Sequence, residues 1–249
     1  MALDCHSFFA TYREGDNLRC APQWQVPESD SVESKRVPMT LPAEPYVEQA
    51  ARWPSKGKHI LAHYDADTIV VYQAYRPSIG KYAIQNDAFG GDFSYSRMSW
   101  IKPNFLWMMF RSGWGTKEGQ EIILGLRMRR QFFDGLLAHA VTSSWDASGQ
   151  ISRDAWKTAV ARSDVRLQWD PDHDPHGKAL PRRAIQLGLR GAALDAFGRR
   201  ELLEVIDMTN FVAEQRSHLR QAGLAQLKTP SEGIYVPHDA AIARHLKLD

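Results

Sequence analysis

Hydrophobic residues follow regular spacings only from about His59 onward. The segment Thr68–Gln73 is rich in β-branched residues and predicts a buried strand. The Asp65-Ala66-Asp67 turn before it predicts a β-hairpin. Further strands are expected over Ile122–Met128, Val165–Trp169, Ala184–Leu189 and Leu202–Ile206. The segment Asp170–Pro181 is expected to be a loop.

Helical spacing appears in the segments between these strands. Proline in a first turn favours helices that begin at Pro77 and just after Pro103. The second of these, Phe105–Arg111, is apolar on nearly every side, so we expect it at the centre of the core. Other helices are expected over residues 46–53, 132–140, 152–163, 191–197 and 209–222. Strands and helices alternate irregularly, which predicts a single α+β domain with a mixed or mainly antiparallel sheet and packed helices.

The start of the chain lacks a sustained period. Residues 1–57 mix Pro, Ser, Glu and Lys and predict an extended or partly ordered N-terminal leader. We therefore expect an α+β catalytic domain over 58–222 and a tail over 223–249 that packs on or near it. A chain of 249 residues buries enough apolar surface to need no disulfide framework. Cys5 and Cys20 are expected to be free thiols in a reducing compartment.

Charge and hydropathy limit the partners that the chain can have. No apolar run approaches the roughly 20 residues that span a bilayer, and the first nine residues do not resemble a secretory signal. A cytoplasmic protein without membrane association or an obligate protein partner is expected. The formal net charge of +2 is too small to attract nucleic acid without a local patch. Candidate patches are Arg127, Arg129 and Arg130, then Arg182 and Arg183, then Arg199 and Arg200, with ordinary solvated positions as the alternative.

Common cofactor and metal motifs do not occur in the sequence. There is no P-loop, dinucleotide fingerprint, nucleophile elbow or paired-cysteine zinc spacing. Asp170, Asp172 and Asp174 imitate the start of a calcium loop, but Pro175 and Pro181 stand where that loop requires Gly and Glu. A solvated loop and an acidic binding loop are the two remaining interpretations. Neither a metal nor a cofactor is expected.

The candidate chemistry is concentrated between Tyr72 and Trp114. Arg97, Lys102 and Arg111 flank the apolar helix and cannot be buried without partners, so we expect them to face a pocket or solvent. Lys102 also precedes a helix N-terminus, where the helix dipole disfavours a cation unless an anion is bound nearby. The glycines around Trp114 either bring the backbone close to a ligand or simply cap the helix.

Two strand ends carry aromatic and polar residues together. Tyr72, Gln73 and Tyr75 end one strand, and Trp169 ends another just before the acidic segment. If the two ends converge, aromatic rings and carboxylates face one cleft together with the cations beside the apolar helix. Such a cleft suits a guanidinium, which stacks on aromatic rings and donates two hydrogen bonds to a carboxylate.

Four segments together resemble a widespread family of unknown function. They are Y-D-A-D-T-I-V-V-Y-Q-A-Y from Tyr64, R-M-S-W-I-K-P-N-F-L-W-M-M-F-R-S-G-W from Arg97, V-R-L-Q-W-D-P from Val165 and R-A-I-Q-L-G-L from Arg183. The family is identified as one that includes the fungal arginine-containing cyclodipeptide synthases. The resemblance implies a cofactor-independent transferase that consumes arginyl-tRNA and a second aminoacyl-tRNA to make a cyclic dipeptide. The long N-terminal leader is also typical of fungal members.

This resemblance implies roles for the residues singled out above. An aminoacyl ester is already activated, so the enzyme mainly aligns an amine with an ester carbonyl, removes a proton and stabilises the oxyanion. Catalytic roles are expected for Tyr72, Gln73, Tyr75, Lys102, Arg111 and Ser112, the last as a hydroxyl for a covalent intermediate. Substrate contacts are expected for Arg97, Trp100, Trp114, Trp169, Asp170 and Asp172. Contacts with tRNA are expected for Arg127, Arg129, Arg130, Arg182 and Arg183.

Two other classes of function fit parts of the sequence. A strand that ends in Tyr72-Gln73 before a short helix is also typical of ADP-ribosyltransferase-like enzymes that use NAD, although Gln73 stands where such folds often place His or Arg. A non-catalytic RNA-binding module would use the arginine clusters and exposed aromatic residues, with strongly salt-dependent affinity.

Overall fold

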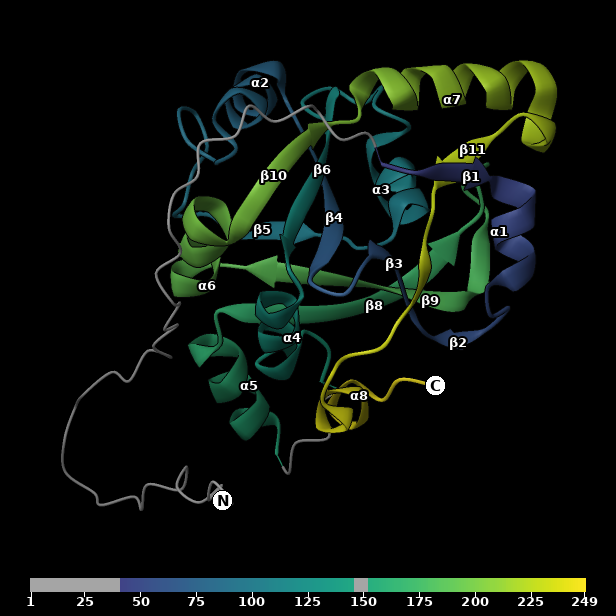
Figure 1. Cartoon of the computed structure of the whole chain (residues 1–249). Helices are drawn as coiled ribbons and strands as arrows, with labels where there is room; N and C mark the ends of the chain where they lie inside the picture. Colours follow the sequence, from purple (N-terminus) through teal and green to yellow (C-terminus); the bar gives the residue numbers. More distant parts are fainter. Residues whose placement is uncertain (1–40, 146–151) are drawn as a thin grey trace, which may run out of the picture. The chain divides into compact units, whose positions relative to one another are not determined.

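Antiparallel strand pairing organises most of the structure, a computed structural model that describes residues 41–145 and 152–249 (Figure 1). One five-stranded sheet is fully antiparallel and has the order β10-β6-β4-β3-β12. Its strands are β3 (Ile60–Tyr64), β4 (Thr68–Tyr75), β6 (Ile122–Arg129), β10 (Leu202–Asp207) and β12 (Gly233–Tyr235). The buried strand and the hairpin predicted around residues 65–73 are therefore confirmed.

The second five-stranded sheet is built on the long β8–β9 hairpin. It has the order β2-β9-β8-β7, and β5 also pairs with β9. Its strands are β2 (Gly57–Lys58), β5 (Ser99–Ile101), β7 (Val141–Thr142), β8 (Val165–His173) and β9 (Ala179–Leu189). In Figure 1, β8 and β9 run across the direction of β4, β6 and β10. The loop predicted over residues 170–181 is too long, because β8 continues through a bulge to His173 and β9 already begins at Ala179.

Helices cover both sheets, as the α+β prediction requires. They are α1 (Tyr46–Arg52), α2 (Pro77–Asn86), α3 (Phe105–Ser112), α4 (Arg130–Ala138), α5 (Arg153–Arg162), α6 (Gly191–Ala196), α7 (Thr209–Ala222) and α8 (Ala240–Leu246). A π-helical turn (Phe197–Glu201) follows α6, and a 3-10 turn (Gly223–Ala225) follows α7. None of the helices within the described ranges is long and apolar enough to cross a membrane.

Helix α3 packs between the two sheets, against β4 and β8. Its residues Phe105–Met109 are buried, which confirms the prediction of a central helix. Asn104 caps the N-terminus by accepting the Trp107 N–H at 2.7 Å, and Glu232 accepts the Phe105 N–H at 2.8 Å. Gly113 ends the helix in the left-handed region, with a φ of 59°.

The described segments on either side of the predicted catalytic domain, residues 41–57 and 223–249, both contribute strands to its sheets or pair with each other. A two-stranded sheet pairs β1 (Ala43–Pro45) with β11 (Lys228–Pro230), so the two segments meet each other. The tail also adds β12 to the first sheet and supplies the buried Glu232. Most of the predicted leader, with Cys5 and Cys20, lies outside the described residues.

Candidate active site

A pocket of about 360 Å³ is lined by side chains from both sheets and from α3. Its lining residues are Trp100, Lys102, Trp107, Arg111, Gln168, Asp170 and Gln186, and we call it the Lys102 pocket. Four of the residues predicted for the site, Trp100, Lys102, Arg111 and Asp170, thus surround one cavity. Tertiary pairing explains the grouping, because β5 and β8 both pair with β9 while α3 packs against β8.

Lys102 is held at the junction of the two sheets. Its backbone pairs with Tyr72 of β4 just after β5 ends, through N–H to O distances of 2.6 and 3.3 Å. The side chain is only 6% exposed and makes no hydrogen bond or ion pair with any residue in the described part of the chain. The pKa of Lys102 is lowered to about 8, mainly by burial and to a lesser extent by Arg111, while Asp170 opposes the shift. An amine with this pKa is available as a base or nucleophile close to neutral pH.

Asp170 is the carboxylate of this pocket and has a fixed orientation. Gln168 donates its amide N–H to Oδ1 at 3.1 Å, and Gln186 donates to Oδ2 at 2.6 Å. The β8–β9 register sets Gln168 opposite Gln186, and strand alternation places Gln168 and Asp170 on the same face. Both carboxylate oxygens are therefore held in place, and each retains a lone pair for a ligand.

Two indole rings form the aromatic part of the pocket. Trp100 lies opposite Gly188 in the β5–β9 register, where a Cβ would come within 3.0 Å of the Trp100 ring. The absence of a side chain at Gly188 therefore lets this indole lie across β9. Trp107 is 5% exposed, and its Nε1–H has no hydrogen-bond partner among the described residues. The pocket thus offers flat rings and one donor that the protein leaves unpaired.

Trp107, Gln168 and Gln186 were not among the predicted site residues. The sequence offers little indication that these residues belong to a site, since glutamines on strands are common and Trp107 fits a core position. The alternation of Gln168 with Asp170 was the one pattern that placed a glutamine beside a predicted carboxylate. That Gln186 lies opposite Gln168 could be known only from the register of β8 and β9.

Tyr72 and Ser112 belong to the core, contrary to the catalytic roles expected for them. Tyr72 is 0% exposed, packs against Phe105, and has a pKa raised well above its ordinary value by burial. The Ser112 hydroxyl is also fully buried; it donates to the Met108 carbonyl and accepts the Gly115 N–H. Neither residue lines the pockets described here, and the burial of both hydroxyls in the core does not fit the catalytic roles expected for them.

Gln73, Tyr75 and Arg97 lie apart from the Lys102 pocket. The Gln73 amide donates to Ser99 Oγ at 2.8 Å and to the Trp100 carbonyl at 2.9 Å. It therefore connects β4 to β5 by hydrogen bonds. Tyr75 and Arg97 line a different cavity of about 400 Å³. Burial raises the pKa of the Tyr75 hydroxyl, which is hydrogen-bonded to Ser99 Oγ at 2.7 Å.

Trp114, Trp169 and Asp172 also fall outside the pocket. Trp114 lines a third cavity. Trp169 alternates with Gln168 and Asp170, so its ring projects from the other face of β8. Asp172 is 1% exposed and forms an ion pair with Arg182, with Oδ2 2.6 Å from Nη2 and 2.7 Å from Nε. The Asp172 carboxylate is thus paired within the fold, which does not fit the substrate contact expected for it.

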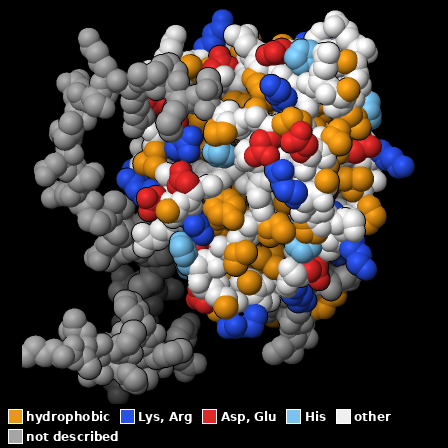
Figure 2. Space-filling view, turned by 45° about the vertical axis from the view of Figure 1, so that its right-hand side comes forward, with side chains coloured by type: hydrophobic (Ala, Val, Ile, Leu, Met, Phe, Trp, Pro, Cys, Tyr) orange, Lys and Arg blue, Asp and Glu red, His pale blue; other side chains and the backbone are white. Residues whose placement is uncertain are grey.

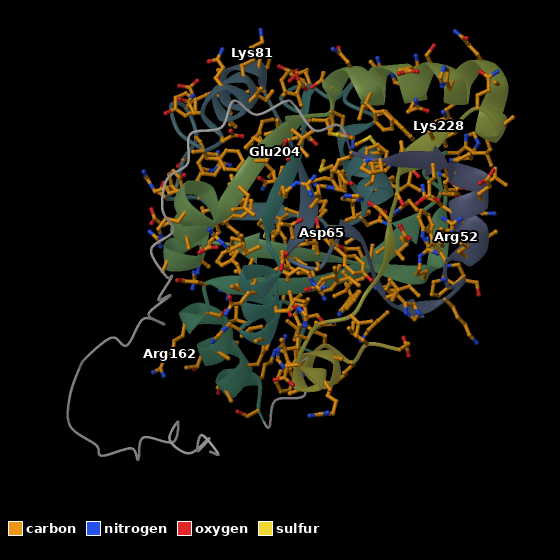
Figure 3. All side chains as sticks on the ribbon, in the orientation of Figure 1. Arg52, Asp65, Lys81, Arg162, Glu204 and Lys228 are labelled. Atoms are coloured by element: carbon orange, nitrogen blue, oxygen red, sulfur yellow. The ribbon has the colours of Figure 1, made fainter. Side chains whose placement is uncertain are left out.

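The arginines predicted to bind tRNA are mostly engaged within the fold. Arg127 is buried and pairs with Glu204 at 3.0 Å and Asp65 at 3.9 Å, two acids labelled in Figure 3. Arg182 is buried in its pair with Asp172, so carboxylates of the fold, rather than phosphates, already bind these two guanidinium groups. The other three bind Glu201 (Arg129), backbone carbonyls near Asp65 (Arg130) and the Trp169 carbonyl (Arg183).

Charge at the surface is mixed. In the face drawn in Figure 2, Lys and Arg side chains are interspersed with Asp and Glu side chains rather than gathered in one large patch. Within residues 41–145 and 152–249, no group of three or more His, Cys, Asp or Glu side chains is arranged to hold a metal ion. The Lys102 pocket is therefore the clearest cluster of reactive groups among the residues described.

Comparison with known proteins gives a family without an assigned activity. A family model described as "Domain of unknown function (DUF4291)" matches residues 59–237, which is more than two thirds of the chain. No curated protein matches the sequence.

Proposed function

The chain belongs to the DUF4291 family, and from this premise we propose that it is a tRNA-dependent arginine-containing cyclodipeptide synthase. It would join the arginyl group of arginyl-tRNA to a second aminoacyl group and release a cyclo-Arg-Xaa diketopiperazine in natural-product biosynthesis. The observation that carries the proposal is the Lys102 amine, which has a pKa of about 8 and shares one pocket with the oriented Asp170 carboxylate. The motif resemblance suggests the reaction class, and the pocket offers a base and a carboxylate that suit it.

The pocket suits the guanidinium of an arginyl group. Asp170 accepts one amide N–H on each oxygen and retains acceptor capacity for two parallel N–H groups. The indole rings of Trp100 and Trp107 line the pocket, and a planar cation that stacks on an indole gains about 0.5–2 kcal/mol. A guanidinium near Lys102 would also lower the pKa of that amine further, because like charges repel. Substrate binding and deprotonation of Lys102 thus favour each other.

Proton transfer is the role that Lys102 would have in the reaction. The α-amine of one aminoacyl group attacks the ester carbonyl of the other, which forms an amide bond and breaks the ester bond to the tRNA ribose. The attacking nitrogen loses a proton, the neutral Lys102 amine takes it, and the departing ribose oxygen receives it. A second attack of the same kind on the remaining ester closes the six-membered ring.

Arg111 would hold negative charge at the pocket mouth. It is exposed, lies at the C-terminal end of α3 and lines the pocket with Lys102. A guanidinium there can stabilise the oxyanion of the tetrahedral intermediate or a terminal phosphate of the tRNA. With Lys102 neutral, Arg111 and Asp170 balance each other, so the pocket admits a positively charged side chain without a net repulsion.

The test uses the full chain with arginyl-tRNA and a mixture of other aminoacyl-tRNAs. The wild type should release an arginine-containing diketopiperazine, detected by mass spectrometry, at a rate that rises with pH up to about 8. Lys102→Met retains the length of the side chain and removes the base, so the rate should fall by about 10²–10⁴-fold. Lys81→Met, at an exposed lysine on α2 that is labelled in Figure 3, is the matched control and should leave the rate unchanged.

Other outcomes would favour the alternative functions. Failure of the wild type to form any cyclic dipeptide, together with consumption of NAD, would indicate the ADP-ribosyltransferase class. The burial of Gln73 behind β5 already speaks against that class, since its amide lines no cavity described above. Salt-sensitive RNA binding without any turnover would indicate the RNA-binding module.

A further inference from the structure

A cavity of about 460 Å³ lies beside the Lys102 pocket, on the other side of α3. Its walls come from the C-terminal end of α3, the Gly113-Trp114 loop, the turn between β8 and β9, and helix α7. The lining side chains include the apolar Met109, Phe110, Trp114 and Leu219 and the basic His176, Arg216 and Arg220. An apolar floor with a cationic wall is the chemistry that fits a nucleotide.

An exposed aromatic ring forms part of the floor. Phe110 is 38% exposed although its ring stacks on His173, with centroids 3.6 Å apart and an interplanar angle of 10°. Trp107 continues the same nearly parallel set, 5.3 Å from Phe110 at 14°. Burial lowers the pKa of His173, which favours the neutral imidazole in this stack. A ring supported in this way is a rigid platform, and stacking of a base on such a ring contributes about 1–3 kcal/mol.

Two arginines one helical turn apart face this platform. Arg216 donates from Nη1 to the Trp114 carbonyl at 2.8 Å, which holds its guanidinium at the wall. Arg220 is exposed and makes no hydrogen bond or ion pair with the rest of the described chain. Asp174 also lines the cavity, where it accepts the His176 and Lys178 N–H groups on Oδ1, both at 2.9 Å, so that oxygen is engaged in closing the turn. The wall therefore carries more positive than negative charge.

The loop that closes the cavity is held in an unusual conformation. Trp114 has a φ of 58°, a left-handed conformation that costs a non-glycine residue roughly 1–3 kcal/mol. Hydrogen bonds fix it to both neighbours, since its Nε1–H donates to the Pro175 carbonyl at 3.1 Å and its own carbonyl accepts from Arg216. The β8–β9 turn, the loop and α7 are thus tied together, so the cavity is formed before any ligand binds.

We propose that this cavity binds a nucleoside phosphate, with the base on Phe110 and the phosphate on Arg216 and Arg220. Its ligand can be a free nucleotide or the 3′-terminal nucleotide of an RNA, which share this chemistry. The second source rests on the proposed synthase function, since Phe110 of this cavity and Arg111 of the Lys102 pocket are adjacent residues at the end of α3. The binding itself is independent of that function.

The test is calorimetric binding of adenosine 5′-monophosphate and of a short RNA that ends in CCA to the full chain. Arg220→Gln should weaken both by about 5–10-fold and lower the salt dependence by roughly one phosphate contact. Phe110→Leu should weaken both by about 5–150-fold, the equivalent of one stacking contact. Arg162→Gln, on α5 and labelled in Figure 3, replaces an exposed arginine remote from α3 and α7 and should have no effect.

Each outcome decides between specific alternatives. Tighter binding of the RNA than of the monophosphate supports an RNA end as ligand, and equal binding supports a free nucleotide. Binding by neither ligand, or binding that Arg220→Gln and Phe110→Leu leave unchanged, would overturn the proposal. Nucleotide binding without formation of a cyclic dipeptide would support this binding site and contradict the proposed synthase function.

Discussion

Asp170 and Asp172 are two residues apart on β8, yet their surroundings differ. Asp172 is buried against Arg182, whose guanidinium also donates to the Pro54 carbonyl and lies over the Trp53 ring. Asp170 is half-buried and lines the same pocket as Lys102. Lys102 is as deeply buried as Arg182 but has no ion-pair partner among the described residues. A bulge after Pro171 separates the two carboxylates. Arg182 is thus neutralised within the fold, whereas Lys102 is left without an ion-pair partner and has a lowered pKa.

This difference has an energetic meaning. A buried ion pair stabilises the fold only while both members are present, because a lone buried charge costs several kcal/mol. A buried lysine without a partner instead destabilises the protein in its charged form, and the lowered pKa measures that cost. Groups that cost stability are common at functional sites, where the same environment makes them reactive.

The largest effect is expected from breaking the neutralised pair. Arg182→Met leaves Asp172 buried without a cation, so the free energy of unfolding should fall by about 3–5 kcal/mol. Urea denaturation followed by circular dichroism measures the change. Arg52→Met removes an exposed arginine that pairs with Glu44 and should cost less than about 1 kcal/mol. Equal losses in the two variants would mean that burial does not distinguish these ion pairs.

Replacing Lys102 is expected to increase the free energy of unfolding, whereas replacing Arg182 decreases it. The pKa of Lys102 is about 8 in the folded protein, against an ordinary value of 10.5. Between these values the unfolded chain binds more protons, so the stability of the wild type should rise with pH from about 8 to 10.5. Below pH 8 the full penalty is present, and Lys102→Met should raise the free energy of unfolding by about 1–3 kcal/mol at pH 7.

Denaturation curves of Lys102→Met and the wild type at pH 7 and pH 10 provide the measurement. The difference between the two proteins should shrink at the higher pH, where the wild-type amine is neutral in the folded state. Lys81→Met controls for the loss of a surface charge. A loss of stability on Lys102→Met at pH 7 would show that the lysine stabilises the fold and would contradict the assignment of a free amine.

The smallest effect is expected from replacing Arg111, which changes only the pKa of Lys102. Arg111 lowers the pKa of Lys102, and Arg111 is exposed, so solvent screens the interaction. Arg111→Gln should raise the pKa of Lys102 by roughly a few tenths of a unit. The pH dependence of Lys102 acetylation, followed by peptide mass spectrometry, measures this shift, with Arg162→Gln as control. A downward shift would indicate that Arg111 does not act on the amine through its charge.

Local patterns in the sequence were sufficient for the elements of the fold. The β-branched run Thr68–Gln73, the Asp65 turn, the proline that begins α2 and the proline before α3 act through short-range sterics and hydrogen bonds. Each of these predictions was confirmed. The cationic flanks of α3 pointed to Lys102 and Arg111 for a physical reason, because charges next to an apolar helix need a pocket or a partner.

The site itself was decided by tertiary structure. The sequence determined that this chain forms an α+β domain with reactive cations beside a central apolar helix. Tertiary pairing alone decided that Asp172 is neutralised by Arg182 while Asp170 is held by Gln168 and Gln186 beside Lys102. The reason is that burial and ion pairing depend on strand register and on residues far apart in the chain, which fix whether a side chain is solvated, paired or free.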